Sequence, residues 1–200
     1  EGWRPDVVIL YPVERLPEAA ATGRPLYAAR ALPGLSDAWH PSSAGPLVAL
    51  QPAPSLELPA AAARIDLQLG DDLELAGFHL PTTIVQPGSV LPLTLYWRAL
   101  VPPGADYSVS LRLLDGAGQE ILRVDSQHPV LGTYPTSFWS AGEIVGDYYE
   151  MQLPAGLPAG TYRWGVIVYR ALPEGGWENL QVADTGQELA LGGSIEVREP

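Results

Sequence analysis

The chain has 200 residues with 23 acidic and 11 basic side chains, a formal net charge of −12 and no cysteine. The lack of cysteine excludes disulfides, thiol nucleophiles and zinc–thiolate sites. The negative charge argues against nucleic acid and anionic membrane surfaces as partners, because both attract basic patches. No apolar run approaches the ~20 residues that a membrane span needs, so we expect no direct membrane insertion. The chain opens at Glu1 without an initiator methionine, and we expect it to be a piece of a longer protein.

Residues 1–60 are predicted to form a small α/β unit, whole or in part. The apolar run Asp6–Tyr11 has the continuous hydrophobicity of a buried strand. Glu14–Thr22 has the composition of a short helix. Two further strands are predicted, over Pro25–Ala29 and Gly45–Leu50.

A segment rich in proline and alanine follows this unit. Pro52, Pro54 and Pro59 remove backbone donors and stiffen the chain toward an extended conformation. We therefore place a domain boundary here, between the N-terminal unit of residues 1–60 and a second domain of residues 64–199.

From Arg64 onward the hydrophobicity alternates with a period of two, which is typical of strands with one buried face. Gly77 interrupts one such run and is predicted to mark a β-bulge. Pro87-Gly88 and Asp115–Gly118 have the composition of tight turns between strands. The side chains predicted to point inward are Ile65, Leu67, Leu69, Leu93, Leu95, Trp97, Tyr107, Val109, Leu111, Leu113, Tyr149, Met151, Leu153, Tyr162, Trp164, Val166 and Val168.

About eight or nine short strands with almost no helix predict two antiparallel β-layers packed face to face. The long link Ser126–Gly146 is what a Greek-key crossing needs. Pro158–Tyr162 resembles the tyrosine corner of immunoglobulin-like sandwiches, in which a phenol at the start of a strand bonds to nearby backbone. The predicted fold is therefore mainly β, an immunoglobulin-like Greek-key antiparallel β-sandwich preceded by the small α/β unit.

Six segments of the predicted sandwich recur in a recognisable order: Leu93–Trp97, Asp106–Asp115, Gly132–Trp139, Gly142-Glu143, Asp147-Tyr148 and Leu157–Tyr169. Together with Arg4–Leu10 and Gly45–Leu50, they resemble the C-terminal extracytoplasmic region of large bacterial multi-spanning, glycosyltransferase-like membrane proteins related to protein O-mannosyltransferases. The resemblance covers nearly the whole chain, but its motifs are turns and core aromatics.

This resemblance implies where the chain is located and which protein it belongs to, and it implies no activity of the chain itself. It implies an extracytoplasmic position, at the cell surface or in a periplasm-like space, tethered through the membrane-embedded portion of the parent protein. In such families the acidic catalytic residues lie in loops of that membrane portion, and none of those loops is present in these 200 residues.

Aromatic side chains provide the first candidate for a binding site. Tyr134, Phe138 and Trp139 in the long link, with Trp177 at a predicted hairpin tip, would form a platform for sugar rings, whose apolar C–H faces stack on aromatics. The alternative is that Tyr134 and Trp139 fill the end of the sandwich, as large aromatics usually do, which leaves Trp177 as the better candidate for exposure. The side chains expected to bond the sugar hydroxyls are Arg98, Glu143 and Asp147.

Carboxylates and histidines provide no metal or catalytic motif. Asp71-Asp72 lacks the alternating ladder with a distal Glu that calcium requires, so a solvated turn is the simpler interpretation. Asp125, Ser126 and His128 lie on one extended segment, on which neighbouring side chains point away from one another, so a triad is not expected. We expect no enzyme activity, no metal and no cofactor.

The leading hypothesis is a non-catalytic extracytoplasmic accessory module of a membrane glycosyltransferase-like protein, with a glycan or polysaccharide as the partner of its sandwich loops. The alternative is a purely structural spacer. A third hypothesis, a glycan-active hydrolase, would need two carboxylates or a Ser–His pair converging in a cleft. An exposed aromatic cleft favours binding, whereas burial of all the aromatics favours the spacer.

Overall fold

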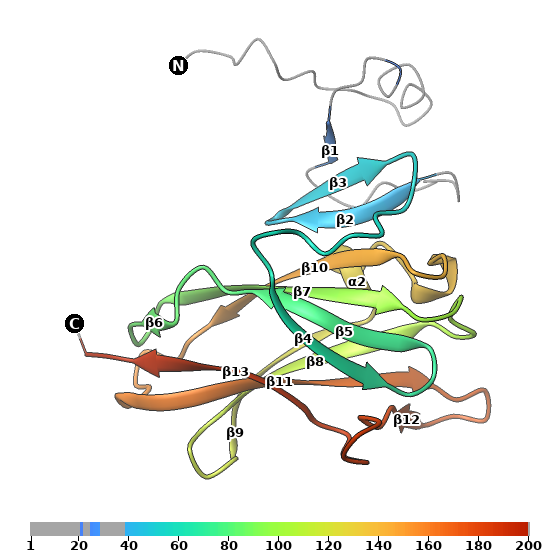
Figure 1. Cartoon of the computed structure of the whole chain (residues 1–200). Coiled ribbons are helices and arrows are strands. Elements are labelled where there is room, and N and C mark those ends of the chain that lie inside the picture. The colour runs from blue at the N-terminus through green and yellow to red at the C-terminus, as the bar shows by residue number, and fades with distance from the viewer. Residues whose placement is uncertain (1–20, 22–24, 29–38, 200) are drawn as a thin grey trace.

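The computed structural model describes residues 21, 25–28 and 39–199, and strands dominate them (Figure 1). The strand predicted over Asp6–Tyr11 lies outside these residues, and so does the helix predicted over Glu14–Thr22, apart from Ala21 in a turn. Among the residues that are described, no helix has the length and apolar character that a membrane crossing requires. The elements are β1 (Leu26–Ala28), β2 (His40–Ala44), β3 (Leu47–Gln51), β4 (Ala63–Leu69), β5 (Leu73–His79), β6 (Ile84–Val85), β7 (Val90–Ala99), β8 (Tyr107–Leu114), β9 (Glu120–Ser126), the turn-like α2 (Pro129–Gly132), the 3₁₀ turn η2 (Thr136–Phe138), β10 (Ile144–Gln152), β11 (Gly160–Ala171), β12 (Trp177–Asn179) and β13 (Ala190–Val197).

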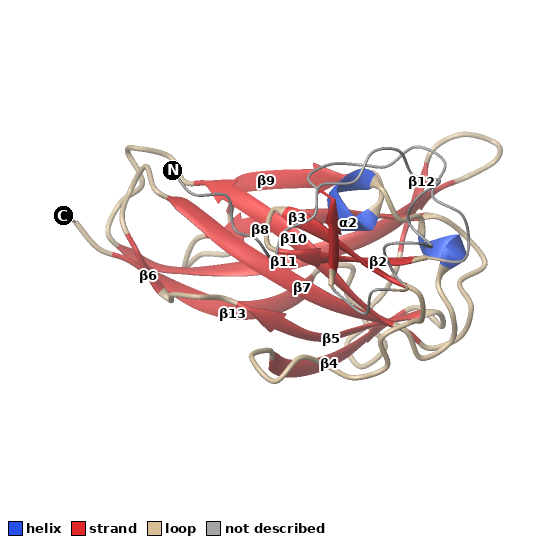
Figure 2. Ribbon diagram, turned by 90° about the horizontal axis from the view of Figure 1, so that it is seen from above, coloured by secondary structure: helices blue, strands red, loops and turns tan. Residues whose placement is uncertain are grey.

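Three sheets lie one above another (Figure 1). The four-stranded sheet has the order β10-β7-β5-β4, and the six-stranded sheet has the order β6-β13-β11-β8-β9, with β12 paired to β11. All pairings are antiparallel except that of β6 with β13. The long link carries the chain from β9 in one of these sheets to β10 in the other, as seen from above in Figure 2. The predicted mainly β sandwich is confirmed.

The core of the sandwich consists of the side chains that the two facing sheets bury between them. Leu93, Leu95 and Trp97 on β7 and Trp164 and Val166 on β11 are each at most 1% exposed. Full burial of one such side chain stabilises the fold by about 1.5–3 kcal/mol. The inward rows that the period-two pattern predicts on β7 and β11 are therefore confirmed.

The glycines predicted to shape the strands have the expected geometry. The register between β5 and β7 shifts between Leu75 and Gly77, and a Cβ at Gly77 would lie 2.7 Å from the carbonyl oxygen of Ala63. Gly88 has a φ of +77°, in a turn closed by the Ser89 N–H on the carbonyl of Gln86 at 3.2 Å. The predicted bulge and turn are confirmed, and each needs the residue without a side chain.

A tyrosine corner closes the start of β11. The hydroxyl of Tyr162 donates to the carbonyl oxygen of Pro158 at 2.9 Å, while its ring is 6% exposed. The phenol thus fixes the chain reversal that precedes the strand, as the sequence predicts.

Replacing Tyr162 with phenylalanine is expected to lower the free energy of unfolding by about 1 kcal/mol, the net contribution of one hydrogen bond in a sheltered place. Urea denaturation followed by fluorescence measures the change. Tyr148→Phe is the matched control, because the Tyr148 hydroxyl bonds the exposed Glu150 at 2.9 Å and should contribute less. Equal losses in the two variants would contradict a special role for the corner.

The third sheet, which we call the N-terminal sheet, has the order β1-β3-β2 and covers the outside of the four-stranded sheet (Figure 1). Its strands β1 and β3 match two predicted strands, but β2 was not predicted. The hydroxyl of Ser42 accepts the Gly146 N–H at 2.8 Å, and the carbonyl of Ser55 accepts the Ile144 N–H at 2.6 Å. Val48 of this sheet belongs to the same continuous apolar cluster as the sandwich core. The division into domains at residues 60–64 stays a prediction.

Candidate functional site

Two of the predicted ligand-binding aromatics lie inside the end of the sandwich. The rings of Tyr134 and Trp139 are 4% and 2% exposed, with their centroids 6.0 Å apart. They present no open ring face, which favours the alternative that they fill the end of the core. Phe138, between them in sequence, is 57% exposed.

Glu143 is the centre of a buried polar cluster beside these rings. Its side chain accepts the Tyr134 hydroxyl at 3.1 Å and the Ser140 N–H at 2.8 Å, and His40 Nδ1 lies 3.0 Å from the same oxygen that Tyr134 bonds. Burial, and then the neighbouring Glu143, raise the pKa of the Tyr134 phenol well above its ordinary value. The carboxylate therefore joins the N-terminal sheet to the long link.

His40 belongs to this cluster but is not among the predicted site residues. It is 103 positions from Glu143 and sits on β2, a strand with little strand signal in its sequence. Only the packing of β2 against β10 brings the two together.

Asp147 occupies a second buried cluster. Its carboxylate is 1% exposed and accepts the Tyr149 hydroxyl at 2.6 Å, the Val130 N–H at 2.8 Å and the Trp97 Nε1–H at 3.4 Å. Burial raises the pKa of Asp147 to about 6, because desolvation outweighs the three donors that favour the charged form. The carboxylate is therefore ionised at pH 7, where it orders three groups of the core.

The Val130 N–H belongs to a left-handed turn. Val130, Leu131 and Gly132 have φ angles of +56°, +57° and +79°. This conformation costs a residue other than glycine about 1–2 kcal/mol, and the cost is highest for a β-branched side chain such as Val130. Asp147 helps to hold the turn in place.

A hollow of about 220 Å³ opens next to Asp147, between β9 and β10. Asp125 and Ser126 lie on one side of it, and Tyr148 and Glu150 lie on the other. The hydroxyl of Ser126 donates to the carbonyl oxygen of His128 at 2.6 Å rather than to its imidazole. The set Asp125, Ser126 and His128 is therefore not arranged as a triad.

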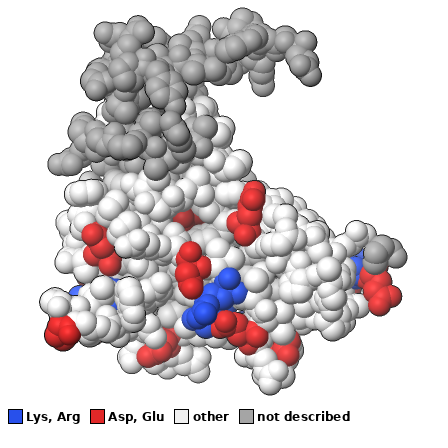
Figure 3. Space-filling view, turned by 180° about the vertical axis from the view of Figure 1, so that it is seen from behind, with Lys and Arg blue, Asp and Glu red and all other residues white. Residues whose placement is uncertain are grey.

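Arg98 lies apart from the other predicted residues. It forms an ion pair with Glu74 across the outside of the four-stranded sheet, and both side chains are largely buried there. Arg112 and Arg170 form ion pairs with Glu120 and Glu178. On the face in Figure 3, basic side chains (blue) lie next to acidic ones (red), and the other charged side chains in view are mostly acidic. These arginines are thus engaged by neighbouring carboxylates.

Trp177 is the most exposed of the predicted site residues, at 67%. Its ring packs edge to face against Tyr169 on β11, with centroids 5.3 Å apart. The cross-strand register places Tyr169 opposite Asn179, whose amide donates to Glu188 at 2.8 Å. Trp177, Tyr169 and Asn179 therefore share one face of the six-stranded sheet, and we call them the aromatic platform.

The six predicted residues do not form one site. Tyr134, Trp139 and Glu143 lie together in the buried end of the sandwich, while the other three, Asp147, Arg98 and Trp177, occupy three further places. Their role in binding stays a prediction, and Trp177 is the one whose ring is free to meet a ligand.

Carboxylates in the predicted turns bond to the protein itself. Asp72 accepts the Tyr107 hydroxyl at 2.8 Å, and Asp115 accepts the N–H groups of Ala117 and Gln119 at 2.8 and 2.9 Å. In the part of the chain that the structure describes, no group of three or more His, Asp or Glu side chains has the arrangement of a metal site.

No protein-family model matches the chain, and no curated protein sequence matches it. Solved structures do match. The C-terminal domain of Wzt is similar over 71% of this chain and 81% of its own, with 10% identity and a TM-score of 0.46. The CARDB domain of the PF1109 protein from Pyrococcus furiosus, solved in complex with di-metal ions, is similar over 73% of this chain and 98% of its own, with 12% identity and a TM-score of 0.37.

A third similar structure is a family 123 glycoside hydrolase from Clostridium perfringens, at 10% identity and a TM-score of 0.37, over 58% of this chain and 22% of its own. With identities this low and TM-scores below 0.5, these likenesses say nothing about ligands. The function proposed below rests on the residues of this chain.

Proposed function

We propose that this chain is a non-catalytic β-sandwich module that binds carbohydrate through the aromatic platform. The observation that carries the proposal is the exposed ring of Trp177 held against Tyr169. An indole that is two-thirds exposed leaves apolar surface in water, and the C–H face of a sugar ring is a partner that can cover it.

Polar groups next to the rings support the same proposal. The amide of Asn179 and the carboxylate of Glu188 lie on the platform side and can together donate and accept hydrogen bonds. The packing against Tyr169 restricts the indole, so less conformational entropy is lost when a ligand binds. A held aromatic face with hydrogen-bonding groups at its edge is suited to a ring that carries hydroxyls.

Trp177→Ala is expected to weaken binding of neutral polysaccharides by about tenfold or more, because the stacking surface is lost. Isothermal titration with mannan, dextran and galactan, together with the change in indole fluorescence, measures the effect. Since Trp177 is mostly exposed, its removal should leave the unfolding midpoint nearly unchanged.

Ile84→Ala is the matched control, because Ile84 is also a large apolar side chain, 46% exposed, on β6 away from the platform. It should bind as the unmodified chain does. A Trp177→Ala protein that retains full affinity would show that the platform is not the contact surface.

A structural spacer is the second candidate, and the burial of Tyr134 and Trp139 favours it. For a spacer, no polysaccharide would produce heat or a fluorescence change with the unmodified chain. The two candidates therefore differ in the first titration, before any variant is made.

The setting of the module is part of the same proposal. The resemblance of Gly132–Trp139 and Leu157–Tyr169 to the extracytoplasmic region of glycosyltransferase-like membrane proteins supports a place outside the cytoplasm, tethered through the membrane-embedded portion of a parent protein. Protease added to intact cells that carry the full-length protein should then cleave this module without lysis. Protection until the cells are lysed would contradict that location.

A further inference from the structure

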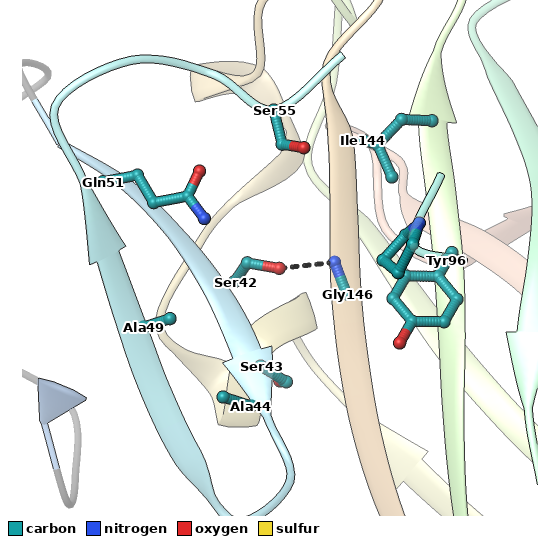
Figure 4. A pocket seen from close by; sticks show the side chains of 10 residues that line it. Ser42, Ser43, Ala44, Ala49, Gln51, Ser55, Tyr96, Ile144 and Gly146 are labelled. Atoms are coloured by element: carbon teal, nitrogen blue, oxygen red, sulfur yellow. Dashed lines mark hydrogen bonds between the residues drawn. The ribbon is translucent and has the colours of Figure 1, made fainter. Parts of the chain in front are cut away.

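A cavity of about 200 Å³ lies between the N-terminal sheet and the outside of the four-stranded sheet. Figure 4 shows its walls. Ser42 on β2, Gln51 on β3 and Ser55 in the following segment lie on one side, and Tyr96 on β7 and Gly146 on β10 lie on the other. The cavity is therefore created by the packing of the N-terminal sheet on the sandwich.

Gly146 keeps the two walls at their spacing. A Cβ at this position would lie 3.0 Å from Ser42 Oγ and 3.2 Å from Cε1 of Tyr96. The Gly146 N–H donates to Ser42 Oγ at 2.8 Å, which ties β10 to β2 beside the cavity (Figure 4). The cavity is thus bordered by paired strands and a fixed hydrogen bond, and the segment that follows β3 closes it with Ser55 and Pro59.

The lining is polar without charge. The hydroxyls of Ser42 and Tyr96 and the amide of Gln51 can each donate and accept hydrogen bonds. Burial raises the pKa of Tyr96, so its phenol is neutral at pH 7. No Asp, Glu, Arg or His is among the residues that line the cavity in the described part of the chain. A charged ligand would lose its hydration here with nothing to compensate, so the lining selects a neutral ligand.

Apolar groups complete the lining. Ala49, Pro59 and Ile144 present carbon atoms, and the half-buried ring of Tyr96 adds an aromatic surface. A ligand with hydroxyls around its rim and C–H groups on its faces satisfies both kinds of wall. The volume is below the roughly 300–1,000 Å³ of pockets for drug-sized ligands, so it suits one ring and not a chain of rings.

We propose that this cavity binds one neutral six-membered sugar ring, either a free monosaccharide or the terminal residue of a glycan. It is a second site, on the outside of the four-stranded sheet, whereas the aromatic platform lies on the six-stranded sheet. The choice of sugar as the ligand rests on the proposed function, while the neutrality and size of the ligand follow from the lining itself.

Nuclear magnetic resonance of the ¹⁵N-labelled full chain, titrated with D-glucose, D-mannose and D-galactose to about 50 mM, tests the proposal. A ligand of this size is expected to bind with a Kd of about 1 mM. The amide signals of Gly146, Ser42 and Gln51 should shift with at least one of the sugars. No shift at these amides with any sugar would overturn the proposal.

Ala49→Leu fills the cavity with three additional carbon atoms from a position that is only half-buried, so the fold should tolerate it. It should weaken sugar binding at least about tenfold. Ala117→Leu is the matched control, at an exposed position in the turn between β8 and β9, and should bind normally. If Ala49→Leu binds as the unmodified chain does, the sugar lies elsewhere and the proposal fails.

Two further titrations, with charged sugars and with methyl glycosides, define the ligand. D-Glucuronate and D-glucosamine should shift the same amides at least about tenfold more weakly than the neutral sugars, and equal binding would contradict the neutral lining. Methyl glycosides distinguish the two sources: unchanged affinity identifies the terminal residue of a glycan, and loss identifies a free monosaccharide. Binding that survives Trp177→Ala but not Ala49→Leu belongs to this cavity, so failure here is distinguishable from failure of the aromatic platform.

Discussion

Replacing Gly192 with alanine is expected to lower the free energy of unfolding by about 3 kcal/mol or more, the upper part of the range for overpacked cores. A Cβ at this position would lie 2.2–2.3 Å from three ring carbons of Trp164. The indole cannot withdraw, because it is fully buried and packs edge to face on Phe78 with centroids 4.9 Å apart. Either β13 moves away from β11 or the core repacks around Trp164. Urea denaturation followed by circular dichroism measures the loss.

Two further variants distinguish the clash with Trp164 from a general effect of replacing glycine. Gly116→Ala adds the same atom in a turn where nothing lies within 4 Å, so its stability should change little. Trp164→Phe shortens the ring that meets Gly192, so the double variant with Gly192→Ala should lose less than the sum of the single losses. Additive losses would show that the glycine and the indole are not in conflict.

Trp164 and Gly192 show why the inward-facing side chains could be predicted from the sequence, whereas the way they pack against neighbouring strands could not. Trp164 falls on the inner face by alternation along β11, which is a local property of the sequence. That its ring lies over the backbone of Gly192 depends on the register of β13 against β11, which shifts between Arg163 and Gly165. Unlike the bulge at Gly77, this shift leaves the alternation along β11 unbroken, so the sequence shows no sign of it.

The turns and the tyrosine corner could be predicted because each is settled within a few residues, as in Pro158–Tyr162. The strand β2 could not be predicted, because His40–Ala44 contains a proline and two serines. It is a strand only because it pairs with β3 and bonds to β10. The cavity beside Ser42 escaped prediction for the same reason. Sequence reasoning located the sandwich but not the surface on which the N-terminal sheet rests.

The candidate site was predictable in part. Exposure of Trp177 follows from the glycines and polar residues around it, and those are visible in the sequence. The burial of Glu143 and Asp147 does not, because their donors come from distant positions: His40 is 103 residues from Glu143, and Trp97 is 50 residues from Asp147. Glu143 and Asp147, which are predicted to bond sugar hydroxyls, accept hydrogen bonds from groups inside the fold.

Asp147→Ala is expected to lower the free energy of unfolding at pH 7.5 by about 3–5 kcal/mol. The substitution leaves the Val130 N–H, the Tyr149 hydroxyl and the Trp97 indole N–H without their acceptor, and each buried unpaired donor costs about 1–3 kcal/mol. It also releases the left-handed turn at Val130, which is unfavourable on its own. Urea denaturation of the variant and of the unmodified chain gives the difference.

The contribution of Asp147 to the free energy of unfolding should depend on pH in a way that identifies its carboxylate. The pKa of Asp147 is about 6 in the folded chain and 3.8 as its ordinary value, so the folded state holds its proton to higher pH than the unfolded state. The stability that this proton gives is complete below about pH 4 and is lost as the pH rises through 6. Between pH 5 and 7.5 the free energy of unfolding of the unmodified chain should fall by about 1.4 kcal/mol through this group. Only the folded state holds the proton between pH 5 and 6, and that interval of one pH unit is worth about 1.4 kcal/mol.

Asp147→Asn is the matched variant for this effect, since the amide keeps the shape and one acceptor oxygen but does not titrate. Its stability relative to the unmodified chain should therefore improve by about 1.4 kcal/mol between pH 5 and 7.5, while the other titrating groups cancel in the difference. The opposite sign would mean that the three donors outweigh desolvation and hold the pKa of Asp147 below its ordinary value. In that case the Val130 turn would be held by a carboxylate stabilised in its charged form, and acid would release it.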